Sequence, residues 1–266
     1  MFEDLEVAVI DDPKVPVLYS QGFLERAKRL QAGMKKTHRW LEKLFGRNEK
    51  SYLAVLDEAD WKASCIPPYG SPHTVWDGPR GFVISSYDYH DAMIDAMLRV
   101  VAQAPPRLER EFRKVRGSDE ANIMRFMDLV ATAHEICHLF TDARRLPMGC
   151  AWLPEFFSHY LTFAYLNETN RQDAKFWKLC EDIWVSQRDL KYRTLDDYEM
   201  HHSDMPLENY IWYQGKFNQR GAQLYGRMGT RFARKVIEEF EVTPEGAYRR
   251  IGDISRDFPK WIENFG

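Results

Sequence analysis

Two histidines and a glutamate near the middle of the chain have the spacing of a metal site. The segment His134-Glu135-Ile136-Cys137-His138 reads HExxH. Residues four apart on an α-helix lie on the same face, one turn and about 6 Å apart along the axis. His134 and His138 can therefore present their imidazoles to a single ion. Zinc is the ion that this pattern favours.

Glu135 has a different predicted role, because it follows the first histidine and points slightly off the ligand axis. A carboxylate in that position can reach a metal-bound water without taking a coordination position, which makes Glu135 the candidate general base. The alternative is that both histidines are hydrogen-bonded side chains of a core helix. Burying two histidines and a glutamate on one apolar helix costs free energy unless something pairs them, and this cost favours a metal.

The two histidines need a third ligand, because a catalytic zinc usually has three protein ligands and one open position. In an HExxHxxGxxH site, a glycine and a third histidine would stand at positions 141 and 144, where this chain has Thr141 and Arg144. Cys150 is another candidate, but it lies in a Pro/Gly turn. Glu155 is the better choice, because it begins a helix after a short reversal, and an antiparallel return would bring its carboxylate opposite both histidines.

This combination resembles the gluzincins, the thermolysin-like zinc metallopeptidases, in which HExxH is followed by a helix bearing a ligand glutamate. The corresponding segment here is Leu153-Pro154-Glu155-Phe156-Phe157-Ser158-His159. The resemblance covers the central third of the chain. It implies a zincin-like fold, a zinc cofactor bound by His134, His138 and Glu155, and hydrolysis of peptide bonds in a peptide or protein substrate.

The chain departs from the family pattern in the second segment. The ligand helix of thermolysin-like enzymes often reads NExxSD, and its aspartate supports the first ligand histidine. This chain keeps Ser158 but has Pro154 and His159 in place of the asparagine and the aspartate. Asp142, one turn past His138, is the replacement candidate for orienting an imidazole. A solvated carboxylate near the helix end is an equal alternative for it.

The resemblance also implies a phenol that stabilises the oxyanion and a strand that binds the substrate. Within residues 209–217, Tyr213 is the first candidate for the phenol and Tyr210 is the reserve, while the alternative is that these aromatic side chains form core. His201 and His202 could serve the same purpose from the preceding loop. The strand at residues 81–86 is a candidate for binding an extended peptide, with a plain internal strand as the alternative.

The remaining pattern predicts an α+β protein. Apolar residues at three- and four-residue steps predict a helix over residues 20–45, and apolar residues at helical spacing also flank HExxH in a long helix that Ser118 or Asp119 can cap. Further helices are predicted over residues 91–102, 152–164 and 175–190, and one or two over residues 209–240. Two β-prone runs at residues 51–56 and 81–86, separated by a Pro/Gly-rich loop, predict a small sheet. We therefore expect an α+β lobe over residues 1–145, which carries the HExxH helix, and a helical lobe over residues 146–266, which carries the third ligand.

Composition excludes several classes of protein. The 266 residues are 44% hydrophobic and 29% charged, which is typical of a globular protein, and the net charge of -3 gives no attraction to nucleic acid or to an anionic membrane. Neither a signal peptide nor an apolar run of membrane-spanning length is apparent, so we expect a cytoplasmic protein. The four cysteines have irregular spacing and no CxxC pair, which predicts free thiols.

Together these patterns predict a zinc-dependent metallopeptidase. The aminopeptidase signature Gly-x-Met-Glu-Asn is missing, so the resemblance favours an endopeptidase. Two alternatives remain open. One is a zinc-stabilised binding or regulatory protein that has lost catalysis, and the other is a zinc hydrolase acting on a non-peptide amide.

Overall fold

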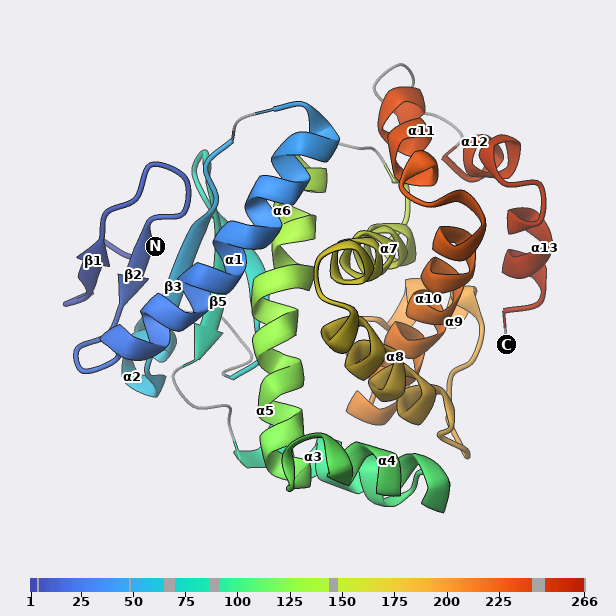
Figure 1. Cartoon of the computed structure of the whole chain (residues 1–266), viewed down its shortest axis with the longest axis horizontal. Helices are drawn as coiled ribbons and strands as arrows, with labels where there is room; N and C mark the ends of the chain where they lie inside the picture. The colour runs from blue at the N-terminus through green and yellow to red at the C-terminus, as the bar shows by residue number, and fades with distance from the viewer. Residues whose placement is uncertain are drawn as a thin grey trace. The chain divides into compact units, whose positions relative to one another are not determined.

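A computed structural model describes residues 1–3, 5–47, 49–64, 70–86, 91–143, 148–240 and 247–265. They form an α+β protein made of two units (Figure 1). Unit 1 comprises Met1–Asp95 and Glu120–Ala143, and unit 2 comprises Ala96–Asp119 and Arg144–Gly266. The division near residue 144 lies close to the predicted boundary, but residues 96–119 belong to unit 2.

Unit 1 contains a mixed sheet whose order is β1-β2-β3-β5-β4 among the described residues. The strands are β1 (Ala8–Ile10), β2 (Val17–Tyr19), β3 (Tyr52–Leu56), β4 (His73–Asp77) and β5 (Arg80–Ser86). β3 runs parallel to β2 and β5, whereas β1 and β4 pair antiparallel to their neighbours. The two predicted strands, β3 and β5, are confirmed. The other three strands were not predicted, and β4 lies inside the predicted Pro/Gly-rich loop.

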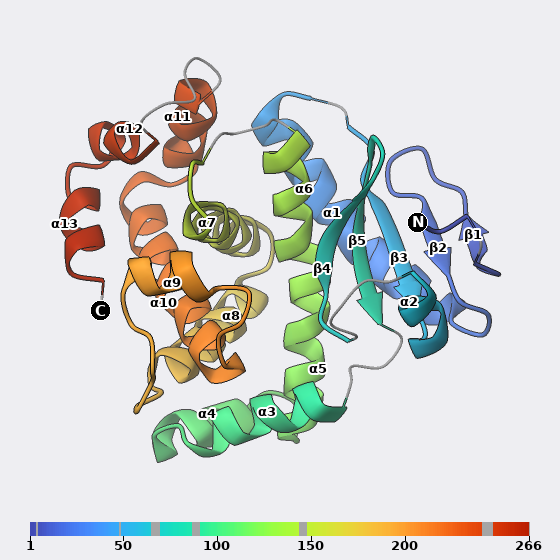
Figure 2. The same cartoon turned by 180° about the vertical axis from the view of Figure 1, so that it is seen from behind.

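The position of β5 decides between the two interpretations of residues 81–86. β5 pairs with β3 on one side and with β4 on the other, so it is an internal strand. Its predicted role as a substrate-binding edge strand is therefore wrong. The strand at that edge is β4, as Figure 2 shows.

Both faces of the central strands are buried, which explains their continuous apolar sequence. On one face, alternate residues of β3 and β5 pack with Phe2 and Trp61, the latter on α2 (Glu58–Ala63). The other face is covered by α1 (Leu24–Phe45) and α6 (Glu135–Ala143). A Cβ atom on Gly81 would lie 2.7 Å from Leu139 of α6, so this glycine lets the HExxH helix lie close to β5.

The predicted helix at residues 20–45 is confirmed as α1, which ends at Gly46 in the left-handed conformation, with φ of 68°. α1 lies beside the long helical run that carries HExxH (Figure 1). That run consists of α5 (Asp119–Leu129), a π-helical turn η1 (Val130–His134) and α6. The helix was predicted, but the π-turn was not.

The regular elements of unit 2 are all helices among its described residues. Its helices are α3 (Asp91–Ala102, which begins in unit 1), α4 (Pro106–Arg116), α7 (Trp152–Thr169), α8 (Arg171–Val185), α9 (Leu195–His201), α10 (Leu207–Met228), α11 (Arg231–Phe240), α12 (Ala247–Ile254) and α13 (Phe258–Glu263). α3, α7, α8, α10 and α11 confirm the predicted segments. α4 and α9 were read only as charged or polar stretches.

α10 is the central helix of unit 2, because it packs against both α7 and α8. Two glycines allow these close approaches. A Cβ atom on Gly221 would lie 3.0 Å from the Cα atom of Tyr160 on α7, and one on Gly215 would lie 2.9 Å from the Cβ atom of Trp184 on α8. None of the helices in the described part of the chain is both long and apolar enough to cross a membrane.

Candidate metal centre

His134 and His138 converge as their spacing predicts. Their Nε2 atoms lie 3.2 Å apart, and both residues are buried, with His134 5% exposed and His138 8% exposed. Two imidazole nitrogens bound tetrahedrally to one zinc at 2.0–2.1 Å would be about 3.3 Å apart. This separation suits two ligands of one zinc ion, and it is also that of a hydrogen bond between the two rings. The shared position of the rings is confirmed, while the identity of the ion stays a prediction.

Glu135 is the first residue of α6 and is 8% exposed. The hydroxyl of Thr74 on β4 donates a hydrogen bond to its Oε2 atom, over 3.2 Å. This contact directs the carboxylate toward the edge strand of the sheet. Thr74 was missed in the sequence because its segment was interpreted as a loop, and no motif marks it.

The π-turn η1 immediately precedes Glu135 and includes His134. Its defining hydrogen bond runs from the backbone N–H of Glu135 to the carbonyl of Val130, five residues earlier. Such turns are rare and occur frequently at functional sites. The one sequence signal is Thr132, whose hydroxyl donates to the carbonyl of Asp128 over 2.7 Å, a bond that often bends helices.

In unit 2, α7 carries two further potential metal ligands. Glu155 lies in its first turn and is half-buried, and His159 lies one turn later and is 5% exposed. A carboxylate oxygen of Glu155 and a ring nitrogen of His159 lie within 4.8 Å of each other. The Nε2 atom of His159 is 2.5 Å from the Oε1 atom of Gln214 on α10. His159 was noticed in the sequence only as a departure from the family pattern.

Tyr213 has the environment of a core residue. Its side chain is fully buried, its ring stacks on Phe265 at 5.7 Å, and its hydroxyl donates a hydrogen bond to the carbonyl of Thr194 over 2.7 Å. Burial, assisted by the charge of Asp197, raises the pKa of Tyr213. The hydroxyl is thus engaged inside the fold, as the alternative interpretation of these aromatics expects.

The reserve candidate, Tyr210, belongs instead to a polar network that includes Glu155. Burial, followed by the charge of Glu155, raises the pKa of Tyr198, and hydrogen bonds from Gln214 and Tyr210 oppose this rise. The Nε2 atom of Gln214 lies 3.5 Å from the Tyr198 hydroxyl. We call this group, Glu155, His159, Tyr198, Tyr210 and Gln214, the α7 cluster. Unlike Tyr213, Tyr210 is only half-buried.

The remaining candidates are His201, His202 and Asp142. His201 stacks on Tyr192 at 4.4 Å, and its Nδ1 atom is 3.6 Å from a carboxylate oxygen of Asp204. His202 is exposed, with its ring 5.8 Å from that of Tyr198. Asp142 is exposed in the last turn of α6, and its role in orienting an imidazole stays a prediction.

The cysteines supply no additional site in the described part of the chain. Cys137, Cys150 and Cys180 form no disulfide, as predicted, and Cys65 lies outside the described residues. The thiol of Cys150, the rival third ligand, donates to the carbonyl of Met148 over 3.4 Å. This bond places it within its own Pro/Gly turn.

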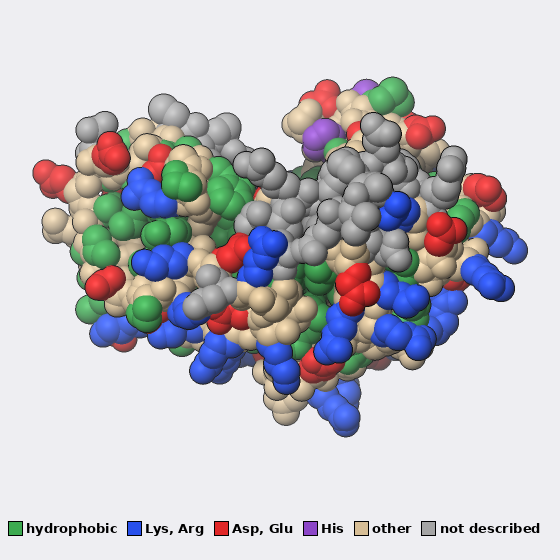
Figure 3. All heavy atoms as spheres, turned by 90° about the horizontal axis from the view of Figure 1, so that it is seen from above, with side chains coloured by type: hydrophobic (Ala, Val, Ile, Leu, Met, Phe, Trp, Pro, Cys, Tyr) green, Lys and Arg blue, Asp and Glu red, His purple; other side chains and the backbone are tan. Residues whose placement is uncertain are grey.

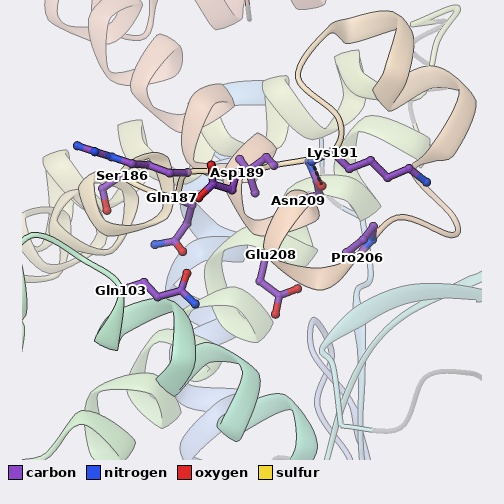
Figure 4. Close-up of a pocket in the computed structure, with 10 residues that line it drawn as sticks. Gln103, Ser186, Gln187, Asp189, Lys191, Pro206, Glu208 and Asn209 are labelled. Carbon is purple, nitrogen blue, oxygen red and sulfur yellow. Dashed lines mark hydrogen bonds between the residues drawn. The ribbon is translucent and has the colours of Figure 1, made fainter.

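A separate pocket of about 640 Å³ lies in unit 2 between the loop after α8 and the start of α10 (Figure 4). Amide side chains of Gln103, Gln187 and Asn209 and the carboxylate of Glu208 line it. None of the predicted site residues is among those lining it. On the face drawn in Figure 3, acidic and basic side chains are interspersed.

No protein-family model, curated protein or solved structure matches this chain. A functional conclusion therefore depends on the chemistry of its own residues.

Proposed function

We propose that this chain is a zinc-dependent metallopeptidase with a zincin-like arrangement, in which His134, His138 and Glu155 hold the metal. The observation that carries the proposal is the convergence of two buried imidazoles, whose Nε2 atoms are 3.2 Å apart. An α+β unit whose HExxH helix packs on a small mixed sheet supports it. Glu155 supports it as a carboxylate in the first turn of the next helix.

When bound, zinc would lower the pKa of a water molecule and polarise the carbonyl of the scissile bond. The residues of the chain supply the remaining steps. The carboxylate of Glu135 accepts a proton from the attacking water and passes it to the leaving amine. The hydrogen bond from Thr74 restrains this carboxylate in one orientation.

Tyr210 replaces Tyr213 as the proposed donor to the oxyanion. A preorganised hydroxyl aimed at the developing negative charge is among the strongest single contributions to catalysis. Both hydroxyls are hydrogen-bonded, that of Tyr213 to the Thr194 carbonyl and that of Tyr210 to Tyr198. Tyr213 is fully buried, whereas Tyr210 is half-buried and shares the α7 cluster with Glu155, which supports its role.

We also propose β4, rather than β5, as the strand that binds an extended peptide substrate. β4 is the last strand of the sheet at its edge, so one row of its backbone N–H and C=O groups has no ladder partner among the described strands. An extended peptide can add to such an edge by main-chain hydrogen bonds. Thr74 ties this same strand to the candidate general base.

The deciding experiment combines metal analysis with one conservative substitution. Purified protein is expected to contain one zinc per chain and to cleave casein or a peptide library. Glu135→Gln, which keeps the side-chain size but cannot accept the proton, is expected to retain the zinc and to lose nearly all cleavage. Undiminished turnover in this variant would refute the base assignment, and protein that binds no zinc would refute the metal site.

One observation favours a different class of function. His159 stands beside Glu155 on α7, and a zinc with four protein ligands is typical of a structural rather than a catalytic site. A zinc-stabilised binding or regulatory protein would contain the metal and cleave no peptide. If peptide libraries are left intact, a product screen with non-peptide amides separates this protein from an amide hydrolase.

A further inference from the structure

One face of α1 runs along the helix that carries His134. Arg26, Gly33 and Thr37 lie on this face, at spacings of seven and four residues. The Nη1 atom of Arg26 is 2.5 Å from the Oδ1 atom of Asp128, at the end of α5. The other two residues meet the π-turn itself, both at Thr132.

The hydroxyl of Thr37 donates a hydrogen bond to the backbone carbonyl of Thr132, over 2.7 Å. Thr37 is 1% exposed and the bond is buried, so this donor, rather than bulk water, meets the carbonyl. The bond therefore links α1 to a buried backbone atom of the π-turn.

Gly33 makes this contact sterically possible. A Cβ atom at Gly33 would lie 3.1 to 3.3 Å from the three side-chain atoms of Thr132, tighter than ordinary van der Waals contact. Two side chains of the helix add to the same arrangement. Thr132 donates to the carbonyl of Asp128, and the thiol of Cys137 is 3.1 Å from the carbonyl of Ala133.

We infer that Thr37 is a positioning residue for the metal ligand His134. By holding the π-turn from α1, it fixes the rotation of the backbone from which the His134 imidazole projects toward that of His138. This inference rests on the proposed zinc site. It adds that the geometry of this site is set by a hydroxyl on a helix outside the HExxH segment.

The test compares Thr37→Val with Thr37→Ser. Valine keeps the shape of threonine but removes the donor, whereas serine keeps the donor. Zinc affinity is measured by competition with a chelator, and ligand geometry is measured from the visible absorption of bound Co²⁺. We expect Thr37→Val to bind zinc about 10-fold more weakly, because loss of hydrogen bonds that support metal ligands typically lowers metal affinity by about this factor. We also expect its Co²⁺ spectrum to differ from that of the wild type. Thr37→Ser is expected to restore both.

Ser64→Ala is the matched control, because it removes another buried hydroxyl of unit 1, which donates to the carbonyl of Trp61. It is expected to lower thermal stability without changing zinc affinity or the Co²⁺ spectrum. A purely structural role of Thr37 would give the same result in Thr37→Val, and that result would overturn the inference while leaving the proposed function intact. Wild-type protein that binds no zinc would instead overturn both.

If Thr37→Val does not fold, Thr37→Ala, which also removes the donor, is measured in its place. Weakened zinc binding with an unchanged far-ultraviolet circular dichroism spectrum supports the inference. Wild-type zinc affinity and a wild-type Co²⁺ spectrum in Thr37→Ala overturn it.

Discussion

The hydroxyl of Thr74, on the edge strand β4, donates a hydrogen bond to the Oε2 atom of Glu135, on the helix of the metal motif, over 3.2 Å. Strand and helix come from segments 61 residues apart. The contact links the strand that we propose for substrate binding to the residue that we propose for proton transfer. Substitution of Thr74 therefore tests the mechanism without changing the proposed metal ligands.

Thr74→Val is expected to lower kcat about 10-fold with little change in KM, because a hydrogen bond to a charged group contributes about 1.5 kcal/mol and a tenfold rate change corresponds to nearly that free energy. Zinc content is expected to stay at the wild-type level. Steady-state kinetics and metal analysis check both expectations. Thr74→Ser keeps the hydroxyl and is expected to retain most of the activity. A Thr74→Val enzyme with wild-type kcat would show that the contact has no catalytic role.

Tyr210→Phe and Tyr213→Phe separate the two candidate phenols. Removing an oxyanion donor costs about 100-fold or more in kcat, which we expect for Tyr210→Phe. Tyr213→Phe removes only the buried bond to the Thr194 carbonyl, so it is expected to lose about 1 kcal/mol of stability and to keep its kcat. Steady-state kinetics and thermal unfolding of both variants measure these changes. A large loss of kcat in Tyr213→Phe but not in Tyr210→Phe would assign the oxyanion donor to Tyr213.

Glu181, on α8, is expected to make the stability of the protein depend on pH. Its side chain is 1% exposed; burial is the main cause that raises its pKa well above 4.5, Asp182 adds to the rise, and Lys178 opposes it. The folded state therefore holds this proton more tightly than the unfolded state. Protonated Glu181 therefore makes its full contribution to folding stability below pH 4.5, the ordinary pKa of a glutamate. This contribution is lost as the pH rises through the raised pKa of the folded state.

Glu181→Gln cannot ionise, so its stability is expected to lose this dependence on pH. Between pH 5 and pH 8 the Tm of the variant, relative to that of the wild type, is therefore expected to rise with pH. Thermal unfolding across this range measures the difference. Glu238→Gln, at an exposed position of α11, is the control and is expected to follow the wild type. Parallel Tm curves for Glu181→Gln and wild type would contradict the prediction.

Two glycines of α10 give a matched pair for the packing of unit 2. Gly221→Ala is expected to cost about 1–3 kcal/mol, because the added methyl group would press on the backbone of Tyr160, 3.0 Å away. A Cβ atom on Gly226 would meet nothing within 4 Å, so Gly226→Ala is expected to stabilise the helix by about 0.5–1 kcal/mol. Denaturant unfolding measures both changes. Equal effects would show that the close approach of α7 and α10 is not what requires Gly221.

Much of the fold could be predicted where local patterns coincide with packing. The helix at α1 repeats apolar residues at helical spacing and ends at Gly46, and both features appear in the structure. β4 could not be predicted, because its sequence lies among glycines and prolines and its strand conformation comes from pairing with β5. α4 was read as a charged segment, although a helix with Pro106 in its first turn and Gly117 after its end has standard boundaries.

The candidate site was predictable to the extent that its residues are local in sequence. The convergence of His134 and His138 follows from one helical turn, and the structure contains it. The contributions of Thr37 and Thr74 depend on how α1 and β4 pack on that helix, and nothing in the spacing of residues shows this. Tyr213 illustrates the opposite error, since aromatic spacing alone does not distinguish a hydroxyl facing a site from one bonded inside the core.

The π-turn has a consequence for how this helix tolerates changes in length. The π-helical hydrogen bond joins residues five apart, whereas an α-helical bond joins residues four apart, so η1 contains one extra residue. Relative to a continuous α-helix, the segments before and after η1 are therefore rotated by about 100° around the helix axis. Deleting a single residue between positions 130 and 133 would let the run close into one uniform helix. The residues before the turn would then rotate by about a quarter-turn relative to the histidines, although every proposed metal ligand would still be present.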